Sequence, residues 1–466
     1  MGFENSQRTE EIKEMESEKI EEINELEQVR EFIKKELPPT EKRIETPMHQ
    51  ECKVSVVIPV YAERKDIFSR TLLSFADQKD VDIDNFEVIC VVNNSKETLG
   101  KIKKENKDSL SMLTYLQNGD ENLLPSDITN KEKEILNKIR DSKINIFAID
   151  KSTKEKAFSK ELANVGGARE RGLAESIARF LENQNKNGII AHTDADTRLG
   201  SQYIASLLNA FDDESVVGVT GPIQMEQGED YLNEKQKIDF TEMNKRFRTY
   251  WSKMQKLFPN SDFIRKNIKD IIGETNNEIS FNGANMASRA FAAAKVGGID
   301  KIAGEEDTTF GKKLSKVGKI IYAPEAIVYP KIRRSLRTTT GHGLRTDQMM
   351  KAFENNGDVI VENPLKIKFI EDSKKSINQL LAEKKLTEEN FLEILKVDDE
   401  FLLNKKDVHI LFEILKNNPN IENLPRENPA VANLSRYIEK ALQKKFPQLT
   451  THEALAQLDD KNNYET

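Results

Sequence analysis

The stretch that decides the fold is IIAHTDADTRLG, residues 189–200. It begins with a short, mostly apolar run and ends with two aspartates, Asp194 and Asp196, placed one residue apart. A continuous apolar run of this length indicates a strand buried on both faces. The two carboxylates therefore come where a buried strand meets a polar site.

Similar apolar runs come earlier in the chain, at residues 54–60 (VSVVIPV), 86–92 (FEVICVV) and 144–149 (INIFAI). Between the first two, DIFSRTLLSFADQ at 66–78 predicts a helix. Because a strand–helix–strand unit forms a right-handed crossover between parallel strands, the pattern predicts an α/β fold. We expect a mixed, mainly parallel sheet flanked by helices.

The aspartate pair suggests a metal site. Ligands of open α/β sheets bind beyond the carboxyl ends of the strands. In an extended chain residues i and i+2 point the same way, so Asp194 and Asp196 would face one site. Two carboxylates suit Mg²⁺ or Mn²⁺, with water and phosphate as further ligands. The alternative is a turn that caps the helix predicted at 201–211.

Polar and small residues follow other predicted strands and open predicted helices. They are Pro59, Tyr61, Glu63, Asn93, Asn94, Gly166, Gly167, Arg169, Glu305, Glu306 and Asp307. Acidic residues also simply favour a helix N-terminus, which is the alternative for the last three.

The order and spacing of these segments resemble the family 2 inverting glycosyltransferases, which have the GT-A nucleotide-sugar fold. The resemblance covers about residues 53–345. Its blocks are IPVYAE (58–63), DADT (194–197), NGANMASR (282–289), VGG (296–298), EEDTTFGKKLSKVG (305–318) and YAPEAIVY (322–329).

The resemblance implies a role for each matching residue. The donor, a nucleoside-diphosphate sugar, would be bound by Pro59, Tyr61, Glu63, Asn93, Arg169 and Asp194. Mg²⁺ or Mn²⁺ would be held by Asp196, with Asp194 contacting metal or ribose. Asp307 would be the catalytic base, taking a proton from the acceptor hydroxyl as it attacks. Glu306 would position the acceptor.

Three positions depart from the family pattern. Ala62 replaces an asparagine, Asn93 an aspartate that contacts the base, and Glu170 an asparagine. The second departure leaves the choice of nucleobase open.

A basic segment follows the last predicted strand. Arg333, Arg334 and Arg337 form a dense cluster that suits a donor diphosphate or an anionic acceptor. His342, between two glycines, suits a place in the metal shell or in a gating loop. The alternative for each of these residues is a solvated loop.

Composition limits the class of protein. The net charge of −8 and pI near 5.6 argue against nucleic acid as the main partner. Cys52 and Cys90 have no metal or redox spacing, so we expect free, packed thiols in a reducing compartment. There is no signal peptide pattern and no transmembrane segment, which predicts a cytoplasmic protein, possibly peripheral at the inner face of the membrane.

We expect three regions. Residues 1–52 form a charged N-terminal helix and linker, and residues 53–362 form the GT-A domain with a helical insertion at about 100–143. Residues 363–466 form a C-terminal all-α region. The terminal helices offer surfaces for a protein partner or self-association.

The expected activity is hexosyltransferase-type transfer of a single sugar to an acceptor hydroxyl of a glycan, lipid carrier or small molecule. It would be a metal-dependent single displacement with inversion. A retaining transferase on the same fold, and a non-catalytic nucleotide-sugar-binding or scaffold protein, are the alternatives.

Overall fold

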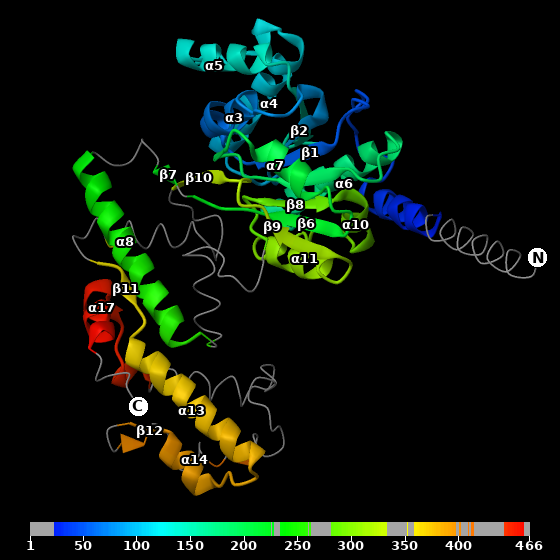
Figure 1. Ribbon diagram of the computed structural model, residues 1–466. Coiled ribbons are helices and arrows are strands. Elements are labelled where there is room, and N and C mark those ends of the chain that lie inside the picture. The colour runs from blue at the N-terminus through cyan, green and yellow to red at the C-terminus, as the bar shows by residue number, and fades with distance from the viewer. Residues whose placement is uncertain are drawn as a thin grey trace, which may run out of the picture. The chain divides into compact units, whose positions relative to one another are not determined.

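The computed structural model describes residues 23–224, 226–227, 234–259, 261, 281–332, 352, 358–397, 400–401, 409, 412–413 and 442–460. These residues divide into two compact units (Figure 1). The first lies within residues 1–228, 276–333 and 337–340, and the second within 229–275, 334–336 and 341–466. This division groups residues 229–275 with the C-terminal helices. The domain limits expected from the sequence stay predictions.

The first unit is built on a seven-stranded sheet in the order β3-β2-β1-β4-β8-β6-β9. Only β8 is antiparallel to its neighbours β4 and β6, so the sheet is mixed and mainly parallel, as predicted. The strands are β1 (Val54–Val60), β2 (Phe86–Asn93), β3 (Asn145–Lys151), β4 (Ile189–His192), β6 (Val216–Thr220), β8 (Met286–Arg289) and β9 (Lys319–Tyr322).

Helices cover both faces of this sheet. They are α2 (Arg64–Asp66), α3 (Leu73–Ala76), α4 (Gly100–Asn118), α5 (Asn130–Asp141), α6 (Val165–Glu182), α7 (Tyr203–Ala210), α10 (Ala290–Lys295) and α11 (Glu306–Leu314). Three short turns join them: the π-helical η1 (Ile67–Leu72) and the 3₁₀ turns η2 (Ile83–Asn85) and η3 (Glu121–Leu123).

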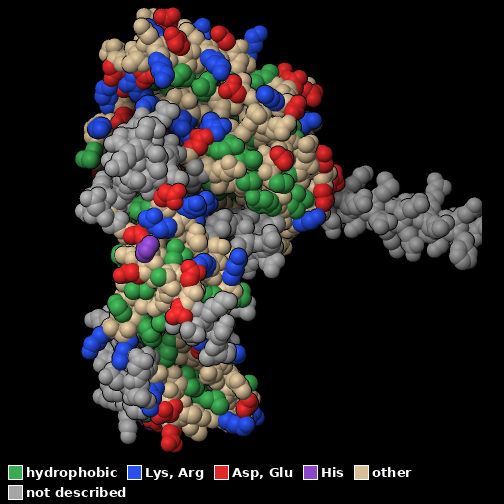
Figure 2. All heavy atoms as spheres, turned by 60° about the vertical axis from the view of Figure 1, so that its left-hand side comes forward, with side chains coloured by type: hydrophobic (Ala, Val, Ile, Leu, Met, Phe, Trp, Pro, Cys, Tyr) green, Lys and Arg blue, Asp and Glu red, His purple; other side chains and the backbone are tan. Residues whose placement is uncertain are grey.

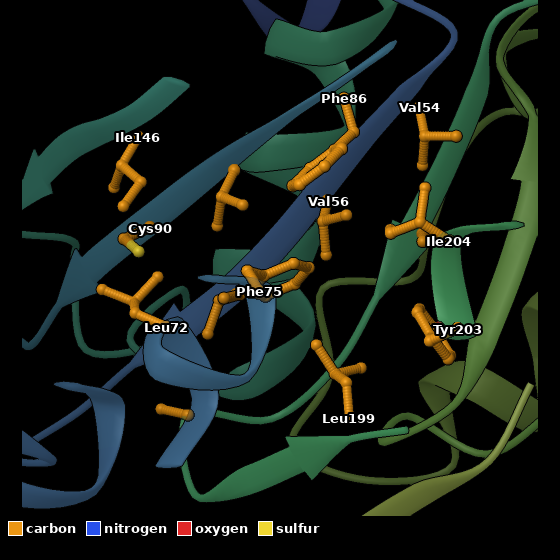
Figure 3. Packing of buried hydrophobic residues seen from close by; sticks show 14 of the residues in the cluster. Val54, Val56, Leu72, Phe75, Phe86, Cys90, Ile146, Leu199, Tyr203 and Ile204 are labelled. Atoms are coloured by element: carbon orange, nitrogen blue, oxygen red, sulfur yellow. The ribbon is translucent and has the colours of Figure 1, made fainter. Parts of the chain in front are cut away.

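Two apolar clusters fix these layers. On one face Phe75 and Phe86 lie with ring centroids 5.9 Å apart, and Leu199 and Tyr203 complete the packing (Figure 3). The other face carries α6, α10 and α11 together with a helix at 23–36. That N-terminal helix buries Val29 in this cluster, so its described part packs against the sheet layer.

Residues 100–143, expected as a helical insertion, form the connection between β2 and β3. Met112 and Leu113 of α4 and Leu136 of α5 are buried in the sheet's first apolar cluster. Cys90 lies in the same cluster, and both cysteines are buried free thiols, as predicted.

A small second sheet follows the aspartate pair. It contains β5 (Thr197–Leu199), β10 (Val328–Ile332) and β7 (Glu226–Gln227), with β10 in the centre. β10 runs antiparallel to β5 and parallel to β7. The chain therefore enters this sheet directly after Asp196.

The second unit is mainly helical, although the all-α region expected at 363–466 also contains short strands. Its helices are α8 (Glu234–Leu257), α13 (Pro364–Ala382), α14 (Glu388–Ile394) and α17 (Thr451–Asp459). Two strand pairs add to them, β11 (Ile360–Val361) with β14 (Leu449–Thr450) and β12 (Lys396–Val397) with β13 (Glu400–Phe401). Trp251 is buried against Tyr250, with ring centroids 5.2 Å apart.

The part of the chain that is described contains no helix long and apolar enough to cross a bilayer. Figure 2 shows basic and acidic side chains interspersed over the described part of one face. Such mixing of charge signs is typical of a solvated surface.

Candidate active site

The predicted motifs meet at the carboxyl edge of the parallel strands. β1 pairs with β2 up to Val60 and Val92, and with β4 up to Val57 and His192. The residues that follow these three strands are therefore neighbours in space.

A buried arginine at the start of α6 pairs with one carboxylate of the DADT block and one of the EEDTTFGKKLSKVG block. Arg169, near the start of α6, donates from Nη2 to Asp194 Oδ1 at 2.6 Å and from Nη1 to Glu306 Oε1. Only 4% of the Arg169 and Glu306 side chains is exposed, against 39% of Asp194. We call Arg169, Asp194 and Glu306 the Arg169 cluster.

The charges of this cluster act on one another. Burial raises the pKa of Glu306, and Arg169 opposes that shift. Burial also disfavours charge on Arg169, but Asp194, Glu306 and Asp307 outweigh it and raise the pKa of Arg169. The guanidinium thus stays positive among three carboxyl groups.

Gly283 of the NGAN motif lets Arg169 reach this place, because a Cβ atom at position 283 would collide with the guanidinium. The Gly283 amide also donates to Asp307 Oδ2 at 2.7 Å, and the Thr308 amide donates to Oδ1 at 2.7 Å. Asp307 is half-buried. Two backbone amides therefore orient its carboxylate beside the Arg169 cluster.

The backbone is strained within two of the motifs. Ala62 has φ 54° and Glu305 has φ 64°, in a region that side chains with a Cβ atom rarely adopt. Ala62 follows β1 and its amide donates to Asn106 Oδ1 at 2.8 Å. Glu305 directly precedes α11. Strain of this kind is concentrated at functional sites, where the surrounding contacts hold it in place.

Asp194 and Asp196 lie in a turn, since β4 ends at His192 and the Thr197 amide donates to the Asp194 carbonyl at 3.1 Å. The extended-chain argument for their common direction was therefore wrong. Of the alternative, a turn that caps the next helix, the turn is confirmed and the cap is wrong, because α7 begins at Tyr203 and its N-cap, Gln202, makes no side-chain cap bond. Asp196 is 7% exposed.

The residue types in this turn suit a hard divalent cation whose ligands come partly from the protein and partly from the substrate. Carboxylate oxygens are ligands that Mg²⁺ and Mn²⁺ prefer, and such ions usually bind one or two carboxylates together with water and phosphate. The described residues contain no group of three His, Cys, Asp or Glu side chains that could hold a metal alone. Asp194 and Asp196 have the ligand chemistry for such a cation, and water and substrate phosphate would supply its other ligands.

The predicted base pocket lies at the ends of β1 and β2. Glu63 and Asn93 are buried, and Pro59 and Tyr61 are partly exposed. Asn93 donates to the Val60 carbonyl at 3.2 Å, so it ties the two strand ends together.

Comparison with known proteins connects part of the chain with a family. Residues 189–345 match the model of glycosyl transferase family group 2. This part of the chain is a glycosyltransferase domain of that family. No curated protein matches the chain in sequence.

Three solved structures resemble this glycosyltransferase loosely. TarS 1–349 from S. aureus in complex with UDP-GlcNAc is 16% identical with a TM-score of 0.34, and the match covers 88% of this chain and 89% of that one. A longer TarS structure is matched over 54% of its length. The mannosyltransferase PcManGT from Pyrobaculum calidifontis in complex with GDP-Man and Mn²⁺ is 11% identical with a TM-score of 0.32, covering 94% and 96%. Superpositions this loose assign no role to any residue.

Two buried titratable residues near Arg169, Glu170 and His192, are surrounded by the protein core. Glu170 accepts from the Ile299 amide at 2.6 Å, and burial raises its pKa to about 8. His192 is fully buried, and neither ring nitrogen has a hydrogen-bond partner. Burial, and then Arg169, lowers the pKa of His192 well below its usual value, so its ring is neutral.

The remaining predicted residues of the glycosyltransferase, Arg333, Arg334, Arg337 and His342, lie outside the described residues. Sequence reasoning missed Asn106, whose side chain donates to the Asn93 carbonyl at 2.9 Å and to Asn94 Oδ1 at 2.7 Å. Nothing in the lysine-rich stretch around it marks it. Sequence reasoning also missed Arg70, which belongs to none of the motifs.

Proposed function

We propose that this glycosyltransferase moves one hexose from a nucleoside-diphosphate sugar to an acceptor hydroxyl in a single displacement with inversion. The observation that supports this most is the Arg169 cluster. It gathers Asp194 and Glu306 around one guanidinium and leaves Asp307 beside them with an oriented carboxylate. The groups needed at the two ends of a displacement thus share one edge of the sheet.

Asp307 is the proposed base. Each of its oxygens accepts one amide hydrogen bond, and a carboxylate oxygen has a second lone pair for the acceptor hydroxyl. The acceptor oxygen bonds to the anomeric carbon as the bond from that carbon to the diphosphate oxygen breaks. The proton goes to Asp307 and the electron pair leaves with the diphosphate. Attack opposite the leaving group inverts the anomeric configuration.

Glu306 and Arg169 would position other groups of the site. Glu306 is buried against Arg169, so it would influence the acceptor through the start of α11. Arg169 holds Asp194 and would keep the aspartate turn close to Asp307. Asp196 and Asp194 would hold Mg²⁺ or Mn²⁺, which when bound neutralises charge on the diphosphate.

A donor screen tests the proposal. UDP-GlcNAc and GDP-Man are the first donors to try, with release of nucleoside diphosphate measured in Mn²⁺ and in EDTA. We expect release with at least one nucleotide sugar, and we expect EDTA to abolish it. Asp196→Asn should lose this release, whereas Asp213→Asn, at a surface ion pair with Lys319, should keep it.

The product of the active donor then decides the stereochemistry. An NMR spectrum taken during transfer should show the anomeric configuration opposite to that of the donor. Retention would exclude Asp307 as the base of a single displacement. Release that is the same in EDTA would exclude the metal.

A further inference from the structure

The chain between β4 and α7 has an unusual source of hydrogen bonds. It contains the aspartate turn, and much of it is neither helix nor strand. Backbone groups in such a segment need partners from elsewhere. Here many come from one neighbouring segment, residues 64–78, which is helical as far as Ala76. The side chains involved are those of Arg70, Thr71, Ser74 and Gln78. We call these four residues the polar stripe.

The polar stripe makes hydrogen bonds to the backbone of the aspartate turn and of the residues that follow it. Arg70 Nε donates to the Asp196 carbonyl at 3.0 Å, and Thr71 Oγ1 donates to the Asp194 carbonyl at 3.4 Å. Ser74 Oγ accepts from the Leu199 amide at 3.0 Å.

Gln78 completes the series. Its Nε2 donates to the Gly200 carbonyl at 2.8 Å, and its Oε1 accepts from the Ile204 amide at 3.0 Å. The same segment is also held by apolar packing, because the side chains of Leu199 and Tyr203 are buried in the core (Figure 3).

Spacing explains how one segment reaches so many of these groups. Arg70 and Ser74 are four residues apart in the helical part, which places them on nearly one face. Gln78 follows α3, which ends at Ala76. Arg70 and Thr71 lie in η1, the π-helical turn at Ile67–Leu72. π-turns inside α-helices are rare and frequently occur at functional sites.

Arg70 differs from the rest of the polar stripe because it also reaches the small sheet. Its Nη2 donates to Glu226 Oε2 at 2.8 Å and to the Tyr329 carbonyl at 3.2 Å. Arg198 donates to the same Glu226 from Nε at 3.1 Å and stacks over the Tyr329 ring. The guanidinium of Arg70 is therefore fixed on one side by β7 and β10 while it holds Asp196 on the other.

We propose that Arg70 is a positioning residue that sets the direction of the Asp196 carboxylate toward the cation and diphosphate. This inference rests on the proposed function. A carbonyl held at residue 196 fixes the peptide plane from which that side chain projects, and metal ligands must be held close to their productive geometry. A merely structural brace would contribute to folding and leave metal binding unchanged.

The test compares three variants of the full chain. Arg70→Met removes all three contacts, and Arg70→Lys keeps the charge but cannot span the three acceptors. Arg64→Met is the matched control, since Arg64 lies in the same helical segment and is also ion-paired, to Asp108 and Asp127. The exposed fractions of the two arginine side chains are similar, 14% for Arg64 and 19% for Arg70.

Binding of Mn²⁺ is measured from the free-ion signal in electron paramagnetic resonance, with UDP or GDP present, alongside the melting temperature. We expect Arg70→Met to weaken Mn²⁺ binding by about tenfold, the loss of one charge-assisted hydrogen bond. Arg70→Lys should lie between it and wild type. Arg64→Met should lower the melting temperature comparably and bind Mn²⁺ as wild type does.

Equal Mn²⁺ binding in Arg70→Met and Arg64→Met would overturn the inference and leave the proposed function intact. If Arg70→Met does not fold, Arg70→Lys decides, and wild-type binding in that variant overturns the inference. A wild-type chain that binds no Mn²⁺ with either nucleotide removes the metal from the proposed function and the inference with it.

Discussion

Helix α6 carries three buried arginines, and two of them, Arg169 and Arg179, differ in their surroundings. Arg179 makes a bidentate pair with Glu87, at 2.9 Å from Nε and 2.6 Å from Nη2, and its Nη1 donates to the Thr46 carbonyl at 2.7 Å. The Arg179 guanidinium also lies over the Phe147 ring. All three of its nitrogens have partners.

Arg169 is equally buried but less completely bonded. Its Nε has no hydrogen-bond partner, and one of its two carboxylates, Asp194, is 39% exposed. A fully paired buried ion pair serves the fold, whereas a buried cation that holds a partly exposed carboxylate can serve a site. Burial and charge are therefore alike at Arg169 and Arg179. What differs is the exposure of the partner carboxylate, 39% for Asp194 and 2% for Glu87.

The largest expected effect is at the Arg169 end of α6. Asp307→Asn should lower kcat by about 10²–10⁴, because a general base contributes that much and an amide cannot take the proton. The donor KM should change little, since the amide keeps the side chain's shape. Steady-state kinetics with the active donor measure both values.

Circular dichroism serves as the control for Asp307→Asn, because a fall in kcat counts only if the variant keeps the wild-type fold. An unchanged kcat would remove Asp307 as the base and leave the Arg169 cluster without a catalytic neighbour.

The second prediction applies one substitution to both arginines. A lysine cannot bond two carboxylate oxygens as a guanidinium does. Arg179→Lys should lower the free energy of unfolding by about 1.5–3 kcal/mol and leave kcat/KM unchanged. Arg169→Lys should lower kcat/KM by about 10- to 100-fold, since one of the carboxylates Asp194 and Glu306 loses its partner.

Urea unfolding and steady-state kinetics are measured on both lysine variants, each of which is the control for the other. If both lose only stability, the two ends of α6 have the same role and the comparison fails.

The sheet could be predicted from the sequence because it depends on local pattern. Val54–Val60 and Phe86–Asn93 are continuous apolar runs, and such runs form buried parallel strands. The order of the motifs then indicated which residues lie at the carboxyl edge.

The site was predicted less completely, because its contacts join residues far apart in the chain. Arg169 was expected to contact donor, and nothing local shows that it pairs with Asp194 and Glu306. The direction of Asp196 was misjudged because β4 ends sooner than the extended-chain argument assumed. Arg70 donates to the Asp196 carbonyl from a π-helical turn, and no periodic pattern in the sequence predicts such a turn.

The smallest effect concerns Glu170, the sequence neighbour of Arg169, whose carboxyl group accepts from the Ile299 amide. Its pKa of about 8 lies above the ordinary 4.5, chiefly because of burial, so the folded protein holds a proton that the unfolded chain releases between those values. The resulting stabilisation is complete below pH 4.5 and is lost as the pH rises through 8. Wild type should therefore lose up to about 1 kcal/mol per pH unit in this window.

Glu170→Gln should flatten that slope, because an amide does not titrate and can still accept from the Ile299 amide. Urea unfolding at several pH values between 5.5 and 8.5 measures it. Glu182→Gln, on the same helix with a side chain 62% exposed, should keep the wild-type slope. A Glu170→Gln slope equal to that of wild type would mean that another group titrates, and Glu170 would then belong with Arg179 among the groups that serve the fold alone.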